Sequence, residues 1–289
     1  MSVEGSTVLI RASAGETNDV RVTLTDAELL VTDAGAPPSA GDGCEAADGG
    51  VSCAVAGVEL LRIELDDGDD RSSVGDTGLP VEVDAGAGND TVDASGALEP
   101  AGLTGGAGQD SLLGGSAKDV LDGGDGNDVL AGGAGSDSIL GGLGLDVLRG
   151  DAGNDELSGG GGADAIAGGA GIDTVSYAER RVSIAVYIDG KPNDGTKKEH
   201  DRVGTDVENA VAGSGNDLLY GSEARNVLVG GGGNDTIIGL GGADRLDGGD
   251  GQDVLVGGPG NDRLRAGPGT DYCNVGPGGG VTRDCERYG

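Results

Sequence analysis

Hydrophobic residues recur with a period of nine along most of the chain. From Gly105 the sequence divides without a gap into eight nine-residue units that end at Ser176, and a second array of seven units runs from Ala212 to Asn274. Each unit opens with six glycine-rich residues and closes with three residues, of which the middle one is aliphatic in every unit except the last, which has Cys273. This regular spacing predicts a repeat architecture, because each unit buries its hydrophobic face only against its neighbours.

Each unit predicts a tight turn followed by a very short strand. Glycine adopts positive φ without steric cost, so the first six residues, which end in aspartate, suit the turn. Alternate side chains of a strand face opposite sides, so the eighth-position residues Leu121, Leu130 and Ile139 point the same way. Two units then make one coil of 18 residues, with two parallel sheets facing each other across Leu, Ile and Val. The predicted fold is all-β, a right-handed parallel β-roll solenoid.

The segments outside the arrays predict caps and an insert. Alternating residues at 7–11, 20–24, 29–32 and 58–65 predict strands, and a single nonapeptide copy begins at Ala85. We expect the N-terminal strands to cap the roll, because an open solenoid end exposes a sheet edge and a slice of the core. The expected parts are an N-terminal β cap region (1–84), a first array (85–176), a decorated insert that continues the roll (177–211), a second array (212–274) and a C-terminal cap (275–289).

Composition and charge narrow the function classes. Acidic residues number 51 against 18 Lys and Arg, a net charge of −33. This charge repels phosphates and anionic lipids, so we expect no nucleic-acid partner and no membrane insertion. No segment approaches the ~20 apolar residues that span a bilayer, and the start at Met1 lacks the pattern of a signal peptide. High charge with 64 glycines is also typical of disordered chains, and only the regular period argues against disorder here.

Aspartate occupies the sixth position of every unit except the one that holds Asn226. Turns on one side of the roll stack, so their carboxylates would lie about 5 Å apart and repel each other unless a cation lies between them. Oxygen ligands from Asp and from glycine-loop carbonyls, with no His or Cys at matching positions, favour Ca²⁺ over Mg²⁺. The predicted metal ligands are Asp90, Asp110, Asp119, Asp128, Asp137, Asp146, Asp155, Asp164, Asp173, Asp217, Asp235, Asp244, Asp253, Asp262 and Asp271.

The stacking predicts four files of side chains and roughly eight to eleven Ca²⁺ ions between successive turns. Two units predict weak sites: the Asn226 unit, which offers an amide and few loop glycines, and the unit with Ala117 and Lys118 in its loop. The files are Asp110, Asp128, Asp146 and Asp164; Asp119, Asp137, Asp155 and Asp173; Asp217, Asp235, Asp253 and Asp271; and Asn226, Asp244 and Asp262.

The units resemble the glycine-rich nonapeptide calcium-binding repeat of the RTX (hemolysin-type) family, GGxGxDxUx. Units such as GGDGNDVLA and GGAGSDSIL carry the resemblance, which covers about half of the chain directly. It implies a parallel β-roll that binds calcium. With a Cys-bearing N-terminal region and a DCE-containing tail, the chain is also similar to exported calcium-binding proteins of actinobacteria.

Four cysteines permit three pairings or four free thiols. Proximity in the sequence favours Cys44 with Cys53 and Cys273 with Cys285. Paired cysteines would indicate an oxidising compartment, which agrees with a repeat that needs the millimolar calcium found outside cells. We therefore expect an extracellular protein, secreted or at the cell surface.

The sequence offers no catalytic constellation. His200 is the single histidine, so neither a zinc-protease HExxH motif nor a Ser-His-Asp triad can form. We therefore expect that the protein is not an enzyme. We expect an extracellular calcium-binding structural or interaction protein whose roll folds when several Ca²⁺ ions bind. Two alternatives stay open: a calcium-dependent secretion or folding module that accompanies an enzyme or toxin, and a self-assembling surface layer or filament subunit. Self-association and a cell-surface partner are both open.

Overall fold

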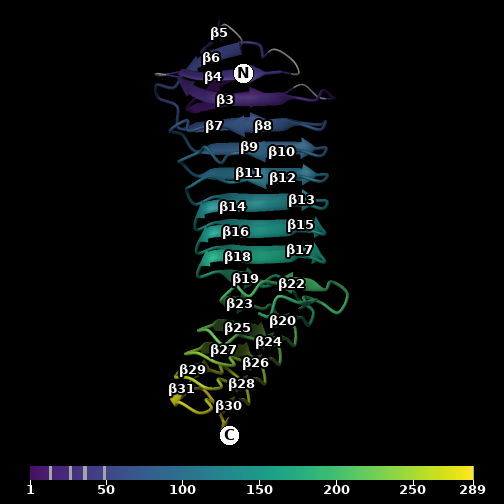
Figure 1. Ribbon diagram of the computed structural model, residues 1–289, viewed down its shortest axis with the longest axis vertical. Helices are drawn as coiled ribbons and strands as arrows, with labels where there is room; N and C mark the ends of the chain where they lie inside the picture. The colour runs from purple at the N-terminus through teal and green to yellow at the C-terminus, as the bar shows by residue number, and fades with distance from the viewer. Residues whose placement is uncertain (13–14, 26–27, 35–37, 48–49, 289) are drawn as a thin grey trace. The chain divides into compact units, whose positions relative to one another are not determined.

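The computed structural model describes residues 1–12, 15–25, 28–34, 38–47 and 50–288, and these residues form strands and turns without a helix. Most strands pair in parallel with the strand one coil earlier and one coil later, which makes the fold a parallel β-solenoid (Figure 1). The predicted all-β roll is confirmed. The chain separates into two compact units, Met1–Asp155 and Glu156–Gly289.

Unit 1 (Met1–Asp155) holds two sheets that run along the roll. The first contains, in spatial order, β1 (Ser2–Glu4), β2 (Thr7–Arg11), β7 (Leu60–Glu64), β9 (Val81–Ala87), β11 (Ala101–Ala107), β13 (Val120–Asp125) and β15 (Ser138–Gly144). The second contains β5 (Cys44–Ala47), β6 (Gly50–Ala54), β4 (Glu28–Asp33), β3 (Asp19–Thr25), β8 (Arg71–Val74), β10 (Thr91–Asp93), β12 (Ser111–Leu113), β14 (Val129–Gly135) and β16 (Val147–Gly153).

The N-terminal strands pair differently from the repeat. β1 and β2 form an antiparallel pair, and β3, β4, β6 and β5 form an antiparallel meander before β3 joins β8 in parallel. The strands predicted at 7–11, 20–24, 29–32 and 58–65 correspond to β2, β3, β4 and β7. The hairpin of β5 and β6 was not predicted, because its short strands carry few large apolar residues.

The core of the roll is one side chain deep from each sheet. Leu103, Leu121 and Ile139 follow each other on successive strands of the first sheet, and each exposes at most 2% of its surface. Leu112, Leu130 and Leu148 do the same in the second sheet. Between β11 and β16 successive coils advance by 18 residues, whereas the earlier coils, which pair Thr91 with Arg71 and with Ser111, advance by 20 residues.

Glycines make the turns possible through their backbone freedom. In the unit GGDGNDVLA, Gly124 has φ of 99° and Gly126 has φ of 151°, in the region that side chains rarely adopt. Glycine therefore suits both positions, although Asp151 (φ 67°) and Leu240 (φ 71°) hold the first of them in two other nonapeptides.

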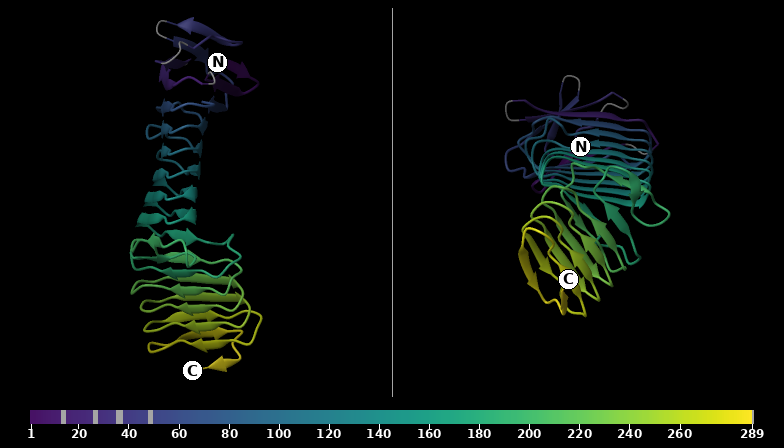
Figure 2. Two further views of the ribbon diagram at one scale, coloured as in Figure 1. Left: turned by 90° about the vertical axis from the view of Figure 1, so that its right-hand side faces the viewer. Right: turned by 60° about the horizontal axis from the view of Figure 1, so that its bottom comes forward.

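Unit 2 (Glu156–Gly289) holds three sheet segments, whose successive turns are visible in Figure 2. One contains β17 (Glu156–Gly162), β19 (Thr174–Ser176), β23 (Asn209–Val211), β25 (Val227–Gly232), β27 (Arg245–Asp250), β29 (Asp262–Arg265) and β31 (Gly280–Arg283). The second contains β18 (Ala165–Gly171), β22 (Asp201–Val203) and β21 (Pro192–Asp194). The third contains β20 (Ala185–Tyr187), β24 (Leu218–Tyr220), β26 (Thr236–Ile238), β28 (Val254–Val256), β30 (Tyr272–Asn274) and β32 (Arg287–Tyr288).

Strand pairing passes through residues 177–211, which we call the insert. β23 pairs in parallel with β19 before it and with β25 after it, so one sheet segment continues through this region. On the other side β22 pairs with β18, and β20 begins the third sheet segment by pairing with β24. Tyr187 of β20 stacks on Tyr220 of β24, with ring centroids 5.0 Å apart.

Both predicted disulfides are present. Cys44 joins Cys53 across the hairpin of β5 and β6, and Cys273 of β30 joins Cys285. No cysteine among the described residues is free. The two bridges lie in the N-terminal strands and near the C-terminal end, outside the glycine-rich turns.

Candidate metal centre

Each glycine-rich turn ends in an aspartate whose side chain points into the protein. Every aspartate that the sequence predicts as a metal ligand is buried, with at most 3% of its surface exposed. The reason is positional: the aspartate immediately precedes the short strand, so its carboxylate folds back into the turn that it closes. Burying a charged group is costly unless it is paired or hydrogen-bonded.

One carboxylate oxygen of these aspartates links successive turns. Within unit 1 and within unit 2, the backbone N–H of a turn aspartate donates to Oδ1 of the aspartate one coil later. Examples are the bonds from Asp110 to Asp128 (2.8 Å) and from Asp235 to Asp253 (2.8 Å). These bonds arrange the side chains in files inside each unit. The files are Asp70, Asp90, Asp110, Asp128 and Asp146; Asp119, Asp137 and Asp155; Asp217, Asp235, Asp253 and Asp271; and Asn226, Asp244 and Asp262.

Two predicted ligands beside the insert meet new partners instead of another turn aspartate. The N–H of Asp164 donates to Oδ1 of Asp201 (3.0 Å), and the N–H of Asp173 donates to Oε2 of Glu208 (2.8 Å). Both aspartates remain buried. The insert thus continues the hydrogen-bond files with carboxylates that stand outside the nonapeptide pattern.

The second carboxylate oxygen lacks a hydrogen-bond donor in many turns. Buried Oδ2 atoms without a donor belong to Asp70, Asp90, Asp110, Asp128, Asp137, Asp217, Asp235, Asp244, Asp253, Asp262 and Asp271. Such atoms are rare in folded proteins, and each calls for an explanation such as a bound ion. A cation that accepts oxygen ligands would supply the missing partner.

The first glycine of each nonapeptide leaves room for these oxygens. A Cβ on Gly105 would lie 2.5 Å from Oδ2 of Asp110 and 2.6 Å from the carbonyl oxygen of Gly123. In the second array, a Cβ on Gly230 would likewise collide with Oδ2 of Asp235 and lie 2.6 Å from the carbonyl oxygen of Gly248. A carboxylate oxygen and a carbonyl oxygen from the next coil therefore converge beside this glycine.

Burial raises the pKa of these carboxyl groups. The pKa of Asp137 rises to about 6 and that of Asp235 to about 7, mainly because burial disfavours the charged form and to a lesser degree because neighbouring aspartates repel it. Hydrogen bonds to Oδ1 act in the opposite direction. Without a cation, the stacked turns are thus strained electrostatically at neutral pH.

Two turns depart from this arrangement, and both belong to units that the sequence marks as weak. Both oxygens of Asp119 accept N–H groups, Oδ1 from Ala101 (2.7 Å) and Oδ2 from Gly115 (2.6 Å). Asn226 accepts from the N–H of Ser222 (2.7 Å) and donates from Nδ2 to the carbonyl of Glu208 (2.6 Å). These two side chains are satisfied by the protein itself.

Some participating residues were not predicted. Asp70 belongs to a degenerate turn at 67–70 that the sequence shows, and it heads the first file with a buried Oδ2. Asp194 and Asp201 of the insert are buried too, but no nine-residue period surrounds them. No sequence signal distinguishes them from the many exposed aspartates of this chain.

The donor set fits a hard cation that accepts backbone oxygens. No three His, Cys, Asp or Glu side chains converge on one point in the part of the chain that the structure describes, so side chains alone would not hold an ion. The turns instead pair carboxylate oxygens with carbonyl oxygens, and Ca²⁺ takes six to eight such ligands in flexible geometry. The residues that would hold it are the turn aspartates and the glycine carbonyls of the neighbouring coil.

Comparison with protein families decides the interpretation of the turns. The family model described as RTX calcium-binding nonapeptide repeat (4 copies) matches residues 82–96, 104–139, 140–175 and, in overlapping segments, 204–281. These matches cover more than half of the chain. The chain belongs to the RTX calcium-binding nonapeptide repeat family. A search of the curated proteins finds no match.

Membership in the RTX family makes this a calcium-binding structural repeat protein. The RTX matches contain the predicted aspartates of both arrays and exclude most of the N-terminal strands and residues 176–203. Among the described residues, no helix is long and apolar enough to cross a membrane. Family membership thus assigns calcium binding to the nonapeptide turns. In these turns the structure brings carboxylate oxygens and glycine carbonyl oxygens together.

Proposed function

We propose that this protein is an extracellular structural or interaction module whose roll forms when calcium binds between stacked turns. The observation that carries the proposal is the row of buried Oδ2 atoms without a donor, which in Asp128 and Asp235 lie beside carbonyl oxygens of the next coil. Calcium would bridge these oxygens and neutralise carboxylates that otherwise repel each other.

Energetics support coupled folding and binding. The core is thin, because each coil contributes mainly one aliphatic residue per sheet and the chain has no Phe or Trp. Ordering a residue costs about 1–2 kcal/mol of backbone entropy, so a coil of 18 residues needs stabilisation beyond this core. Calcium binds the folded turns and not the extended chain, and its binding free energy therefore contributes directly to folding.

The proposed complement is roughly eight to eleven Ca²⁺ ions. The turns of Asp119 and Asn226 are the places where we expect an ion to be missing, because the protein already satisfies both side chains. About ten ions would cancel some 20 of the 33 negative charges, which lowers the repulsion along the roll.

The disulfides and the calcium requirement support a location outside the cell. Disulfides persist in oxidising compartments, and Cys44–Cys53 and Cys273–Cys285 are both formed. Extracellular calcium is abundant enough to saturate sites of modest affinity. We propose a structural rather than catalytic role, in which calcium maintains a rigid module.

A calcium titration of the stripped protein, followed by far-UV circular dichroism, tests the proposal. We expect a cooperative gain of β signal at roughly 0.1 mM calcium, and no such gain with Mg²⁺ at the same concentration. A β spectrum that is already complete in chelator at neutral pH would contradict coupled folding.

A variant identifies the ligands. Replacing Asp128 and Asp146 with Ala should raise the calcium midpoint several-fold, because two turns of one file lose their carboxylates. The control variant replaces the exposed Asp42 and Asp76 with Ala, which removes the same charge away from the turns and should leave the midpoint nearly unchanged. If the calcium midpoint shifted equally in both variants, the shift would come from the change in net charge and not from the loss of ligands.

A further inference from the structure

Five arginines gather on one exposed face of unit 2. Arg225, Arg245, Arg263, Arg265 and Arg283 line a hollow of about 380 Å³ that extends over β27, β29 and β31. We call this surface the arginine face. The whole chain has only 18 Lys and Arg against 51 acidic residues, so such a cluster departs from the rest of the molecule.

Strand register places four of these five side chains in two rows. Arg245 pairs with Arg263 on the neighbouring strand, and Arg265 pairs with Arg283. In-register residues of neighbouring strands lie about 5 Å apart, and residues two apart on one strand face the same side. The guanidinium groups therefore crowd each other on one face, and like charges placed side by side destabilise a sheet.

The arginine face has little internal neutralisation. In the described part of the chain its one ion pair joins Arg265 Nη1 to Asp247 Oδ2 (3.2 Å). The carboxylate of Asp244, which also lines the hollow, is buried and bonded through Oδ1 to the N–H of Asn226. The face thus presents several unneutralised positive charges to solvent.

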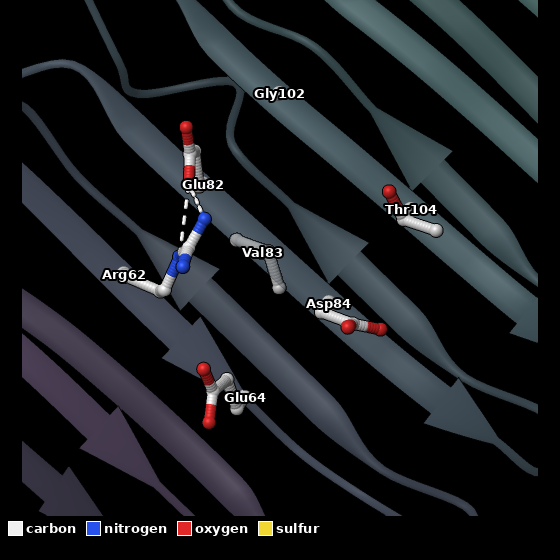
Figure 3. A pocket seen from close by; sticks show the side chains of 7 residues that line it. All are labelled: Arg62, Glu64, Glu82, Val83, Asp84, Gly102 and Thr104. Carbon is white, nitrogen blue, oxygen red and sulfur yellow. Dashed lines mark hydrogen bonds and ion pairs between the residues drawn. The ribbon is translucent and has the colours of Figure 1, made fainter.

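A second hollow, on the outer face of unit 1, shows the opposite arrangement. There Arg62 forms an ion pair with Glu82 on the neighbouring strand (Figure 3). Glu64, which also lines the hollow, forms an ion pair with Arg11 (2.8 Å). Asp84 adds a further negative charge beside them. Both arginines there have a carboxylate partner from the chain itself, whereas on the arginine face only Arg265 has one among the described residues.

We propose that the arginine face binds an acidic polysaccharide. Each guanidinium presents a planar fork of donors that fits carboxylate and sulfate groups in a bidentate manner. The rows extend over three strands on an open surface, which suits an extended chain with several anionic groups better than a single small ion. Ala243 and the exposed Val281 supply apolar contacts between the charges for the C–H faces of sugar rings.

The same surface does not suit a nucleic acid. Among the residues that the structure describes, no aromatic side chain lines the hollow, so unpaired bases would find nothing there to stack on. A densely charged duplex would also meet repulsion from the surrounding acidic surface. A flexible polysaccharide contacts only the arginine face, and at physiological ionic strength the Debye length of about 8 Å screens the more distant carboxylates.

The test measures binding of a heparin-derived hexasaccharide by calorimetry, at a fixed calcium concentration that saturates the protein. We expect binding to the wild type that weakens with added salt. Replacing Arg263 and Arg265 with Glu should lower the affinity at least about tenfold, since each charge-assisted contact contributes about 1.5–3 kcal/mol. A control variant replaces Arg21 and Arg149 with Glu, which makes the same charge change at exposed sites of unit 1 and should change the affinity less than about twofold.

Further arms identify the chemistry of recognition. Replacing Arg263 and Arg265 with Lys keeps the charge but removes the planar guanidinium donors. We expect an affinity between those of the wild type and the Glu variant. A heparosan oligosaccharide, which carries carboxylates without sulfates, shows whether sulfate is required. No binding of either oligosaccharide, equal losses in both charge-reversal variants, or equally tight binding of single-stranded DNA or poly-glutamate would overturn the proposal. Circular dichroism of every variant in calcium verifies that the roll is intact.

Discussion

The repeat turns and the insert bury the same chemical group and satisfy it differently. In the repeat turns, Oδ1 of Asp137 accepts an N–H while Oδ2 has no donor. In the insert, Asp194 accepts an N–H at each oxygen, from Tyr187 (2.6 Å) and Val203 (2.9 Å). Asp201 likewise accepts the N–H of Asp164 at Oδ1 and the hydroxyl of Tyr177 at Oδ2 (2.9 Å).

We propose that this difference decides which buried carboxylates of the chain bind calcium. Burial raises the pKa in both regions, to about 7 for Asp194 and for Asp235, so a perturbed pKa does not separate them. The number of protein donors does separate them. A carboxylate with two donors is complete without an ion, whereas one with a single donor keeps an oxygen for calcium.

The largest expected effect is the removal by calcium of the pH dependence of stability between about pH 5 and 7. Without calcium, the pKa of Asp137 is about 6 and that of Asp235 about 7, above the ordinary 3.8 of the unfolded chain. The folded chain then binds more protons than the unfolded chain between about pH 4 and 7, so its unfolding free energy falls as the pH rises through this window. With calcium, the folded carboxylates stay ionised, and above about pH 5 the unfolded chain is ionised too, so the unfolding free energy changes little with pH until it falls below about pH 5.

Circular dichroism of metal-stripped and calcium-loaded protein at about pH 5 and about pH 8 measures this difference. We expect the stripped protein to gain β structure on acidification, and the thermal stability of the loaded protein to change little. Parallel pH profiles with and without calcium would mean that the turn carboxylates do not compete for protons and calcium.

Much of this arrangement could be predicted from the sequence. The position of aspartate and of the aliphatic residue in each nonapeptide predicts the files and the core, because a strict period places equivalent residues above one another. The weak turn of Asn226 was also predictable, since its unit lacks loop glycines. These predictions depend on the nine-residue period, so they do not extend to segments that lack it.

The insert could not be predicted to the same depth. The donors to Asp194 lie seven and nine residues away, and the hydroxyl bonded to Asp201 lies 24 residues away. These contacts depend on a local path of the chain that no period describes. The early coils of 20 residues escaped prediction for a similar reason, because the nonapeptide copy that begins at Ala85 stands alone there and one copy sets no period.

A methyl group beside the free oxygen should disturb the repeat turns strongly. In Gly123→Ala, the new Cβ would lie 2.6 Å from Oδ2 of Asp128 and would also collide with the carbonyl of Gly141. We expect a loss of about 2–3 kcal/mol in unfolding free energy with calcium present, and a higher calcium midpoint. Thermal and denaturant unfolding in calcium measure the loss.

Gly102→Ala is the matched control for this variant. Its Cβ would meet nothing closer than Cγ of Glu82 at 3.8 Å, so the same change of residue type has room. We expect a change within about 0.5 kcal/mol. Equal destabilisation by both substitutions would assign the effect to the backbone freedom of glycine rather than to the space beside the carboxylate.

The smallest expected effect comes from Asp-to-Asn substitutions, and it compares the two regions directly. In Asp194→Asn, an amide NH₂ must face the N–H of Tyr187 or of Val203, so we expect a loss of about 1–3 kcal/mol both with and without calcium. In Asp235→Asn, Oδ1 can keep the N–H of Asp217, and the NH₂ can face a carbonyl, as Nδ2 of Asn226 does at Glu208.

We therefore expect Asp235→Asn to raise the calcium midpoint while leaving the calcium-free protein, measured at mildly acidic pH where it retains structure, as stable as the wild type. Denaturant unfolding at several calcium concentrations separates the two responses, because a loss independent of calcium shifts every curve equally. If Asp194→Asn changed the midpoint as much as Asp235→Asn does, the insert carboxylate would act as a calcium ligand, and its two N–H donors would have to be exchanged for the ion on binding.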